Sequence, residues 1–267
     1  MHSLIDNSRN FMLRKKNTIM RISIITVCYN RKETIKKTIE SVLRQSFPNI
    51  EYIIIDGNST DGTTQIIESY KNQLSQYISE PDNGMYDAIN KGLQLATGDV
   101  IGLMHSDDEF YDSNVVEKIV ARFADDQNID GIYGDGIYVS NDDDQRIIRD
   151  RIGGRFSIKK IKNGWLPLHP TVYLKKSVID KNGVYSLDFK IASDTEFLLR
   201  YLYRHKIKIS YINIYIVKMR MGGLSTNLGG VVAVLYEDYK IYKFHGLTAF
   251  QAVFLKKTIA LRQYLLN

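Results

Sequence analysis

Residues 22–30 read ISIITVCYN and residues 51–62 read EYIIIDGNSTDG, and the two stretches share one pattern. Each contains a mostly apolar run, and the centre of the second run is apolar on both faces, which is typical of a strand in a parallel sheet that is buried on both sides. Each run then ends in polar residues. Between them, apolar residues recur at helical spacing from 35 to 42. The sequence therefore opens with a strand at 22–27, a helix, and a second strand at 51–56.

The alternation of strand and helix continues to residue 124. Asn30 and Glu33 have the spacing of a capping box, so the first helix is predicted to start there and to end near Gln45. The elements expected next are helix 63–70, strand 76–80, helix 85–96, strand 100–105 and helix 114–124. This order predicts an α/β protein with a doubly wound, mostly parallel sheet, in which ligands bind at the carboxyl ends of the strands.

The second half of the chain is less regular. The elements predicted there are strands 131–140 and 145–152 joined by an acidic turn at 141–144, strand 171–174, helix 194–205, a β-rich stretch 206–219, and helices 230–244 and 248–266. The first nineteen residues are polar and basic, and they precede the first strand. We expect them to form a disordered extension, so that protein starting at Met20 keeps its stability.

Composition excludes several classes of protein. Of the 267 residues, 44% are hydrophobic and 25% are charged, which is ordinary globular composition. The single cysteine, Cys28, excludes a disulfide framework and a cysteine-based zinc cluster. No apolar run approaches the roughly 18 residues that a membrane span needs. The net charge of +6 permits anionic partners, but the basic residues form no nucleic-acid recognition module, and we expect no nucleic-acid partner.

Polar side chains follow three strands of the predicted sheet. Thr26 and Tyr29 follow the first, Asp56 the second, and Asp107 and Asp108 the fourth. A carboxylate can accept a hydrogen bond from a base or ribose, and a tyrosine ring can stack on a base. Two adjacent aspartates suit Mn²⁺ or Mg²⁺, which would bridge a diphosphate. Each aspartate alone would be read as a helix cap or a solvated turn, but their convergence at one sheet edge favours a site.

Other common α/β sites are not supported. The chain has no G-x-G-x-x-G after its first strand, no P-loop and no G-x-S-x-G elbow. The absence of these motifs argues against a dinucleotide site, a P-loop nucleotide site and a serine hydrolase.

Several spaced motifs resemble the glycosyltransferase family 2 domain with the GT-A fold. They are IITVCYN at 24–30, IIDGNSTDGT at 54–63, EPDNGMYDAINKG at 80–92 and ATGD at 96–99. The resemblance covers about residues 20–225. The runs 84–92 and 222–225 are similar to transferases that build bacterial surface polysaccharides, of the colanic-acid type. The resemblance implies a GT-A domain at 20–228 with an irregular β-rich acceptor half, followed by a C-terminal helical tail at 229–267.

The same resemblance implies an inverting transfer from a nucleotide-diphosphate sugar, most often a UDP-sugar. The acceptor would be a hydroxyl of a glycan or of a lipid-linked sugar. Carried over position by position, the donor-binding residues are Thr26, Tyr29, Asp56, Ser59, Asp82, Asp87, Asn90 and Ser106.

The metal-binding Asp-x-Asp of the family falls on residues 105–107. Asp107 matches the second aspartate, whereas the first position is His105. The resemblance implies a divalent metal, Mn²⁺ or Mg²⁺, with Asp107, Asp108, His105 and His169 as the candidate ligands. Two alternatives stay open: His105 is a packed histidine at the strand end, and His169 has a purely structural role.

Asp194 is the candidate general base by the same resemblance. It lies in ASDTEF at 192–197, where family members place an acidic motif at the start of a helix. The acceptor hydroxyl must lose a proton as it attacks the anomeric carbon, and a carboxylate can accept it. The alternative is that Asp194 or Ser193 only caps the helix. Glu196 points about 200° round the helix from Asp194, so the two cannot face one acceptor equally.

Two other functions remain as alternatives. One is a non-catalytic nucleotide-sugar-binding partner, which the altered metal motif would suit but which has no need of Asp194. The other is a sugar-phosphate nucleotidyltransferase, whose glycine-rich N-terminal loop is replaced here by TVCYN at 26–30.

The expected location is the cytoplasm, with peripheral contact at the inner face of the cytoplasmic membrane. The last predicted helix carries an apolar set and a basic set that suit anionic lipid, namely Phe250, Val253, Phe254, Leu261 and Leu265 with Lys256, Lys257 and Arg262. The alternative, that this face packs on the domain, stays open.

Overall fold

The computed structural model describes residues 20–140, 146–220 and 228–265. The predicted extension at 1–19, the acidic turn at 141–144 and the 222–225 motif therefore lie outside the described residues.

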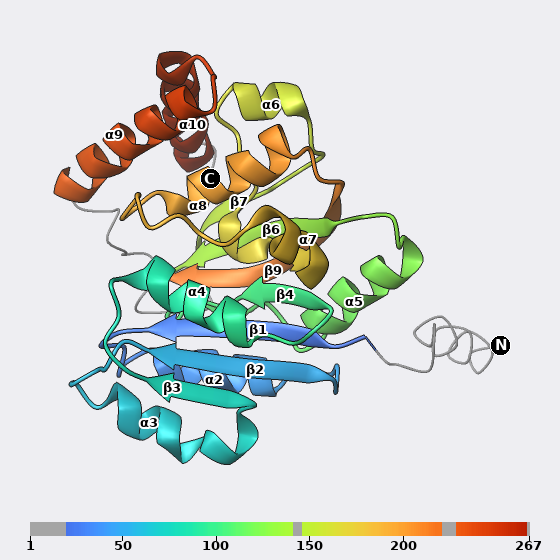
Figure 1. Cartoon of the computed structure of the whole chain (residues 1–267), viewed down its shortest axis with the longest axis vertical. Helices are drawn as coiled ribbons and strands as arrows, with labels where there is room; N and C mark the ends of the chain where they lie inside the picture. Colours follow the sequence, from blue (N-terminus) through green and yellow to red (C-terminus); the bar gives the residue numbers. More distant parts are fainter. Residues whose placement is uncertain (1–19, 141–145, 221–227, 266–267) are drawn as a thin grey trace.

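Within these ranges, nine strands form one sheet in the order β3-β2-β1-β4-β8-β6-β9-β5, with β7 paired to β6 (Figure 1). The strands are β1 Ile22–Cys28, β2 Ile50–Asp56, β3 Gln76–Ser79, β4 Val100–Leu103, β5 Glu109–Phe110, β6 Gly131–Val139, β7 Ile147–Arg151, β8 Tyr173–Lys175 and β9 Ile209–Arg220. Strands β3, β2, β1 and β4 are mutually parallel, which confirms the predicted α/β half. The sheet then continues through antiparallel pairs with β8.

Helices cover both faces of this sheet. They are α2 Ile35–Leu43, α3 Thr63–Ser69, α4 Met85–Leu95, α5 Val115–Asp125, α6 Ile158–Lys162, α7 Lys176–Asn182, α8 Ser193–Leu199, α9 Leu228–Phe244 and α10 Ala249–Leu265. A π-helical turn at Arg200–Arg204 extends α8, and 3₁₀ turns lie at Lys71–Gln73 and His169–Thr171. The short helices α6 and α7 were not predicted, because five and seven residues are too few to show a helical period.

Alternate residues of the central strands point to opposite cores. Ile25 and Val27 of β1 pack in a cluster with α4, α7 and α8, whereas Ile22 and Ile24 pack in a second cluster with α2 and α5. Full burial of each such side chain contributes about 1.5–3 kcal/mol. Because both of its faces are buried, β1 has no solvent-exposed face.

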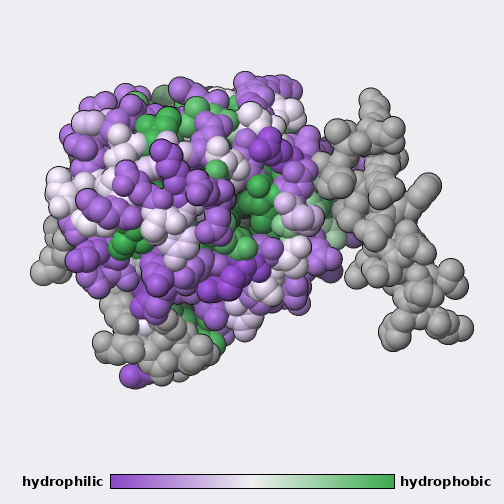
Figure 2. All heavy atoms as spheres, turned by 90° about the horizontal axis from the view of Figure 1, so that it is seen from below, coloured by the Kyte–Doolittle hydropathy of each residue, from purple (hydrophilic) through white to green (hydrophobic). Residues whose placement is uncertain are grey.

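The helix pair α9–α10 lies at one end of the molecule's long axis, and β3 and α3 lie at the other (Figure 1). The face below β3 and α3 is mostly hydrophilic, with its hydrophobic residues in small patches (Figure 2). Scattered apolar residues of this kind are normal on a protein surface.

The predicted capping box at Asn30 and Glu33 is wrong. Helix α2 begins at Ile35, and no side chain caps it. Asn30 instead has a φ of 52°, in the left-handed region, and its Oδ1 accepts a hydrogen bond from the N–H of Thr60 at 2.9 Å. Its amide therefore holds the loop after β2 rather than the helix after β1.

Substitution of Gly102 in β4 tests how closely β4 packs against β8. It lies opposite Tyr173 in the antiparallel pair, and a Cβ at residue 102 would overlap the buried Tyr173 ring. Gly102→Ala should therefore lower the free energy of unfolding by about 1–3 kcal/mol, measured by urea denaturation. In a Tyr173→Leu background the same substitution should cost clearly less, because the two residues are in contact. Equal losses in both backgrounds would show that the ring is not the obstacle.

Candidate active site

A cleft of about 810 Å³ opens at the carboxyl ends of β1 and β4. Its walls come from the loops after these strands, from residues 164–170, from the start of α8 and from Lys256 of α10. The predicted position of the site at the carboxyl edge of the parallel sheet therefore coincides with a cleft large enough for a nucleotide sugar.

The loops after β1 and β2 interlock beneath one wall of the cleft. The Asn30 N–H donates to Ser59 Oγ at 2.8 Å, and the Arg31 N–H donates to Thr63 Oγ1 at 2.7 Å. Asp56 is fully buried. Its carboxylate accepts bonds from the Ser59 N–H and from the hydroxyls of Ser59, Thr64 and Ser79. Asp56 and Ser59 therefore support this wall from beneath, and neither residue lines the cleft itself.

Tyr29 and Asp82 do line the cleft, and they meet over Gly57. The Tyr29 side chain is 59% exposed, so its ring is available to stack on a flat base. A Cβ on Gly57 would lie 2.5 Å from Asp82 Oδ2 and 3.4 Å from the Tyr29 ring. The loops after β1, β2 and β3 therefore come together at Gly57, where a larger side chain would have to displace the Asp82 carboxylate.

Three other predicted donor-binding residues lie away from the cleft lining. The Thr26 side chain is buried, and its Oγ1 lies 3.2 Å from the Tyr52 hydroxyl. Asp87 accepts from the N–H of Asn83 at 2.9 Å. Asn90 uses both ends of its amide on the backbone of Tyr185, each at 2.9 Å. Ser106, in contrast, does line the cleft.

The loop after β4 is held by two threonines of the α2 region. The Thr34 hydroxyl donates to the carbonyl of Ser106, and the Thr38 hydroxyl donates to the carbonyl of Asp108, both at 2.8 Å. His105, Asp107 and Asp108 all line the cleft. Burial, together with the charges of Asp107 and Glu109, raises the pKa of Asp108 well above its ordinary value.

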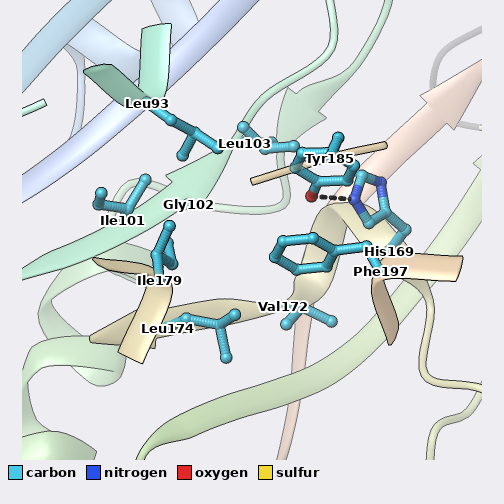
Figure 3. Close-up of a pocket in the computed structure, with 10 residues that line it drawn as sticks. All are labelled: Leu93, Ile101, Gly102, Leu103, His169, Val172, Leu174, Ile179, Tyr185 and Phe197. Atoms are coloured by element: carbon cyan, nitrogen blue, oxygen red, sulfur yellow. Dashed lines mark hydrogen bonds between the residues drawn. The ribbon is translucent and has the colours of Figure 1, made fainter. Parts of the chain in front are cut away.

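His105 and His169 approach each other across the cleft, with ring centroids 5.9 Å apart. Burial lowers the pKa of His169 to about 4 and also lowers that of His105, so both imidazoles are neutral at pH 7. His169 Nε2 lies 2.6 Å from the Tyr185 hydroxyl (Figure 3). An apolar cavity of about 20 Å³ lies behind this pair. That volume is enough for about one water and far too small for a sugar.

Asp194 lies in the first turn of α8 and lines the same cleft. Its Oδ1 accepts from the Thr195 N–H at 2.8 Å and lies 3.4 Å from the Tyr86 hydroxyl. Neither Asp194 nor Ser193 occupies the N-cap position of α8, which is Ala192, and Ser193 donates to the carbonyl of Ser186. Glu196 is buried and bonded to Arg200 Nε at 3.0 Å, outside the cleft lining.

The side chains at the end of β4 can be tested against a cation that a bound diphosphate would help to hold. Among the described residues, no three His, Cys, Asp or Glu side chains are grouped to hold a metal by themselves. His105 and Asp107 offer a neutral imidazole and a carboxylate at one strand end. Mg²⁺ is commonly bound by one or two carboxylates plus substrate phosphates, and Asp107 would supply one such carboxylate. His169 is less available, since its Nε2 already contacts Tyr185.

Sequence reasoning missed several residues that line the cleft, namely Arg31, Tyr86, Arg151, Trp165, Lys190 and Lys256. Tyr86 lies inside the motif at 80–92, and its contact with Asp194 spans 108 positions of the chain. The others carry no local signal, because single basic or aromatic residues in irregular segments do not predict which of them meet.

The chain is similar to known glycosyltransferases. The family model described as Glycosyl transferase family 2 matches residues 23–185. An uncharacterised glycosyltransferase of Mycobacterium tuberculosis is 33% identical over 183 residues, which cover 67% of this chain and 68% of the relative. A PGL/p-HBAD biosynthesis glycosyltransferase of Mycobacterium bovis is 25% identical over 210 residues, covering 77% of this chain and 79% of the relative.

Solved structures show the same fold at low identity. Staphylococcus aureus TarS 1–349 in complex with UDP-GlcNAc has a TM-score of 0.63 and 21% identity, covering 83% of this chain and 65% of that one. In a longer TarS chain the match spans 39% of the length. A Pyrobaculum calidifontis mannosyltransferase in complex with GDP-Man and Mn²⁺ has a TM-score of 0.61 and 14% identity, covering 95% of this chain and 76% of that one. The present chain, with its α/β sheet and C-terminal helices, has the GT-A fold, and it belongs to glycosyl transferase family 2.

Proposed function

We propose that this protein is an inverting transferase that moves a sugar from a nucleotide-diphosphate sugar, with UDP-sugars as the expected donors. The acceptor is a hydroxyl of a glycan or lipid-linked sugar in the synthesis of a bacterial surface polysaccharide. One observation carries the proposal: a single cleft is lined by Tyr29, by the His105–Asp107 pair and by Asp194. These residues supply, in turn, a stacking surface for a base, ligands for a diphosphate-bound cation and a general base.

The reaction needs one carboxylate in contact with the acceptor. Asp194 accepts the proton of the acceptor hydroxyl as that oxygen attacks the anomeric carbon from the face opposite the leaving nucleoside diphosphate. The new C–O bond forms as the bond to the diphosphate breaks, so the anomeric configuration inverts. Mn²⁺ or Mg²⁺, when bound, would neutralise charge on the diphosphate, and His105 and Asp107 are the residues that would hold it.

Tyr86 lies beside the Asp194 carboxylate and bonds the backbone that precedes it. Its hydroxyl donates to the carbonyl of Ile191 at 2.9 Å and lies 3.4 Å from Asp194 Oδ1. Burial, with a further contribution from the Asp194 charge, raises the pKa of Tyr86. The phenol therefore stays protonated, and its single proton bonds the Ile191 carbonyl, the nearer of the two acceptors.

A donor panel tests this function directly. Thermal unfolding would be followed with UDP, GDP, and their common sugar conjugates, each with and without Mn²⁺. A ligand at 100 times its dissociation constant stabilises the folded state by about 2.7 kcal/mol, so the true donor stands out. The donor found is then incubated with candidate acceptors, and release of the nucleoside diphosphate is measured. Stabilisation by no nucleotide at all would contradict the proposal.

The same panel separates the alternatives. A non-catalytic partner would bind a nucleotide sugar and release no nucleoside diphosphate with any acceptor. A nucleotidyltransferase would instead bind a nucleoside triphosphate and a sugar 1-phosphate and release pyrophosphate.

Peripheral contact with an anionic membrane is the location that we propose for the C-terminal helices. Phe250 and Phe254 of α10 are 78% and 60% exposed, with ring centroids 6.5 Å apart. On α9, Tyr236 is exposed, as are Lys240 and Lys243. Aromatic residues beside lysines suit the interface of acidic lipids. No helix in the described ranges has the length and apolar character to cross a bilayer.

Part of the predicted membrane face is used inside the protein. Val253 packs against the hydrophobic core, and Lys256 forms an ion pair with the buried Asp238 at 2.7 Å. The other members of that face have side chains outside the described set, namely Lys257, Leu261, Arg262 and Leu265.

Vesicle flotation tests the membrane proposal. At low salt the protein should float with vesicles that contain acidic lipid and remain unbound with purely zwitterionic vesicles. The double substitution Phe250→Ser with Phe254→Ser should lower the bound fraction several-fold, because it removes apolar area from the surface. Absence of binding to acidic vesicles would end the proposal.

A further inference from the structure

The segment that leads into α8 is held by a carboxylate of α9. Glu237 accepts hydrogen bonds from three consecutive backbone N–H groups: Lys190 at 3.0 Å, Ile191 at 2.9 Å and Ala192 at 2.9 Å. Oε1 serves the first of these donors, and Oε2 serves the other two. Charge-assisted bonds to a carboxylate are among the stronger protein hydrogen bonds, so this side chain fixes the path of residues 190–192.

This path decides where the Asp194 carboxylate lies. Helix α8 starts at Ser193, directly after the segment that Glu237 binds. Both backbone polar groups of Ile191 are bonded: its N–H donates to Glu237, and its carbonyl accepts from Tyr86. Lys190, Ile191 and Asp194 all line the cleft. A shift of the segment would therefore move the proposed base relative to the bound substrates.

A second contact from the C-terminal helices reaches the same turn of α8. Lys256 Nζ of α10 lies 3.1 Å from Thr195 Oγ1 and 2.7–2.8 Å from both carboxylate oxygens of Asp238. Asp238 is fully buried and follows Glu237 directly on α9. The loop at Gly164 also lies against α10, because a Cβ on Gly164 would overlap the carbonyl of Ala252.

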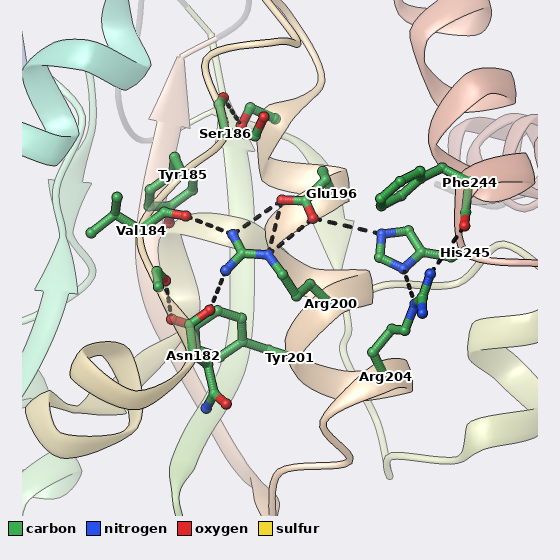
Figure 4. A network of polar contacts seen from close by, with 12 residues as sticks. Asn182, Val184, Tyr185, Ser186, Glu196, Arg200, Tyr201, Arg204, Phe244 and His245 are labelled. Atoms are coloured by element: carbon green, nitrogen blue, oxygen red, sulfur yellow. Dashed lines mark hydrogen bonds and ion pairs between the residues drawn. The ribbon is translucent and has the colours of Figure 1, made fainter.

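The rest of α8 is fixed independently of Glu237. Arg200 donates to Glu196 and to the carbonyls of Asn182 and Val184 (Figure 4). His245, at the end of α9, lies 3.7 Å from Glu196 Oε1. These bonds anchor the helix on the side away from the cleft. Glu237 therefore acts on the entry to the first turn, where Asp194 is found, and not on the helix as a whole.

We propose that Glu237 is a positioning residue for the transfer reaction, acting through the backbone of residues 190–192 to hold Asp194 within reach of the acceptor. The proposal rests on the function proposed above. The family match ends at residue 185 and so assigns nothing to α9. Helices α9 and α10 are in this view part of the active site rather than an appended tail. Ile241, Tyr242, Ala249 and Ala252 of these helices pack in the same core cluster as α4 and α8.

Glu237→Gln is the first test. The amide retains one acceptor oxygen and places an NH₂ group where the other oxygen had accepted an N–H, so at least one of the three bonds is lost. We expect kcat to fall about 10- to 100-fold, because a misplacement of about 1 Å can cost 10²-fold, while the affinity for UDP stays within about twofold of wild type. Glu68→Gln, an exposed glutamate of α3, is the matched control and should leave both unchanged.

A double-mutant cycle distinguishes positioning from a general structural role. If Glu237 acts through Asp194, Glu237→Gln should cause little further loss in an Asp194→Asn background. Independent, multiplicative losses would overturn the proposal. So would a loss of rate that only follows a loss of folded protein or of UDP affinity. Glu237→Asp, which keeps the charge but is one methylene shorter, should fall between wild type and Glu237→Gln.

The same measurements keep the two proposals apart. If wild-type protein transfers sugar and Asp194→Asn does not, but Glu237→Gln retains the wild-type kcat, the positioning role is wrong and the proposed function stands. If Asp194→Asn transfers at the wild-type rate, Asp194 is not the base, and the positioning proposal is overturned with that assignment.

Discussion

Asp194→Asn should lower the rate of sugar transfer by about 10²- to 10⁴-fold, which is the range that general-base catalysis typically supplies. Asparagine has nearly the same shape, and its amide oxygen can still accept the Thr195 N–H that Asp194 Oδ1 accepts at 2.8 Å. The asparagine amide, however, cannot accept a proton from the acceptor hydroxyl at the pH of the assay. Stability and the affinity for the donor nucleotide should therefore stay near wild type while the chemical step slows.

The measurement is nucleoside diphosphate release at saturating donor and acceptor, alongside calorimetric titration with UDP. Asp180→Asn is a suitable control, because Asp180 is an exposed aspartate of α7 and that substitution should change neither quantity. A variant at residue 194 that transfers sugar at the wild-type rate would rule out this base. One that no longer binds the nucleotide would make Asp194 a donor ligand instead.

Asp107→Ala should spare the binding of uridine and abolish the Mn²⁺-dependent gain in UDP affinity. Asp107 lines the cleft next to His105, and its loss removes an anchor for the cation that would neutralise the diphosphate. Such charge stabilisation amounts to several kcal/mol in metal-assisted reactions. Sugar transfer should accordingly fall by at least about 10²-fold.

Asp56→Ala provides the contrast for that experiment. Its buried carboxylate holds Ser59, Thr64 and Ser79, and the loop that it supports lies beneath Tyr29 through Gly57. Binding of uridine should weaken as much as binding of UDP, because the nucleoside end of the cleft loses its support. Titrations in which both variants show the same loss with both ligands would contradict this division between nucleoside and diphosphate.

The parallel half of the fold could be predicted from sequence because its signals are local. Strands β1 and β2 are buried on both faces, so most of their residues are apolar. The connecting helices show their buried face as a period of 3.6, as Ile35, Ile39 and Val42 do in α2. Short crossovers between such elements leave few topologies, and parallel strands end at one edge. The placing of a site at that edge follows from these facts.

The direction in which side chains point at the strand ends could not be predicted from the sequence. Asp56 and Asp107 both follow apolar runs, yet Asp56 is fully buried in a hydrogen-bonded loop while Asp107 lines the cleft. Asn90 lies in a motif of the donor half, but its amide is used on the backbone of Tyr185. The choice between support and lining depends on which donors surround each carboxylate or amide once the loops have packed.

The sequence by itself determined the α/β order, the edge of the sheet that carries the site and the chemical types of the residues there, because each of these depends on periodicity or on neighbours along the chain. Only the tertiary structure decided which residues act together. Tyr86 meets Asp194 across 108 positions, and Glu237 meets the segment before α8 across 45 to 47. Such contacts are set by how α4, α8 and α9 dock on one core, and docking leaves no periodic trace in the sequence. Glu237, in a C-terminal helix, can act on the proposed base only because that helix lies against the backbone before Asp194.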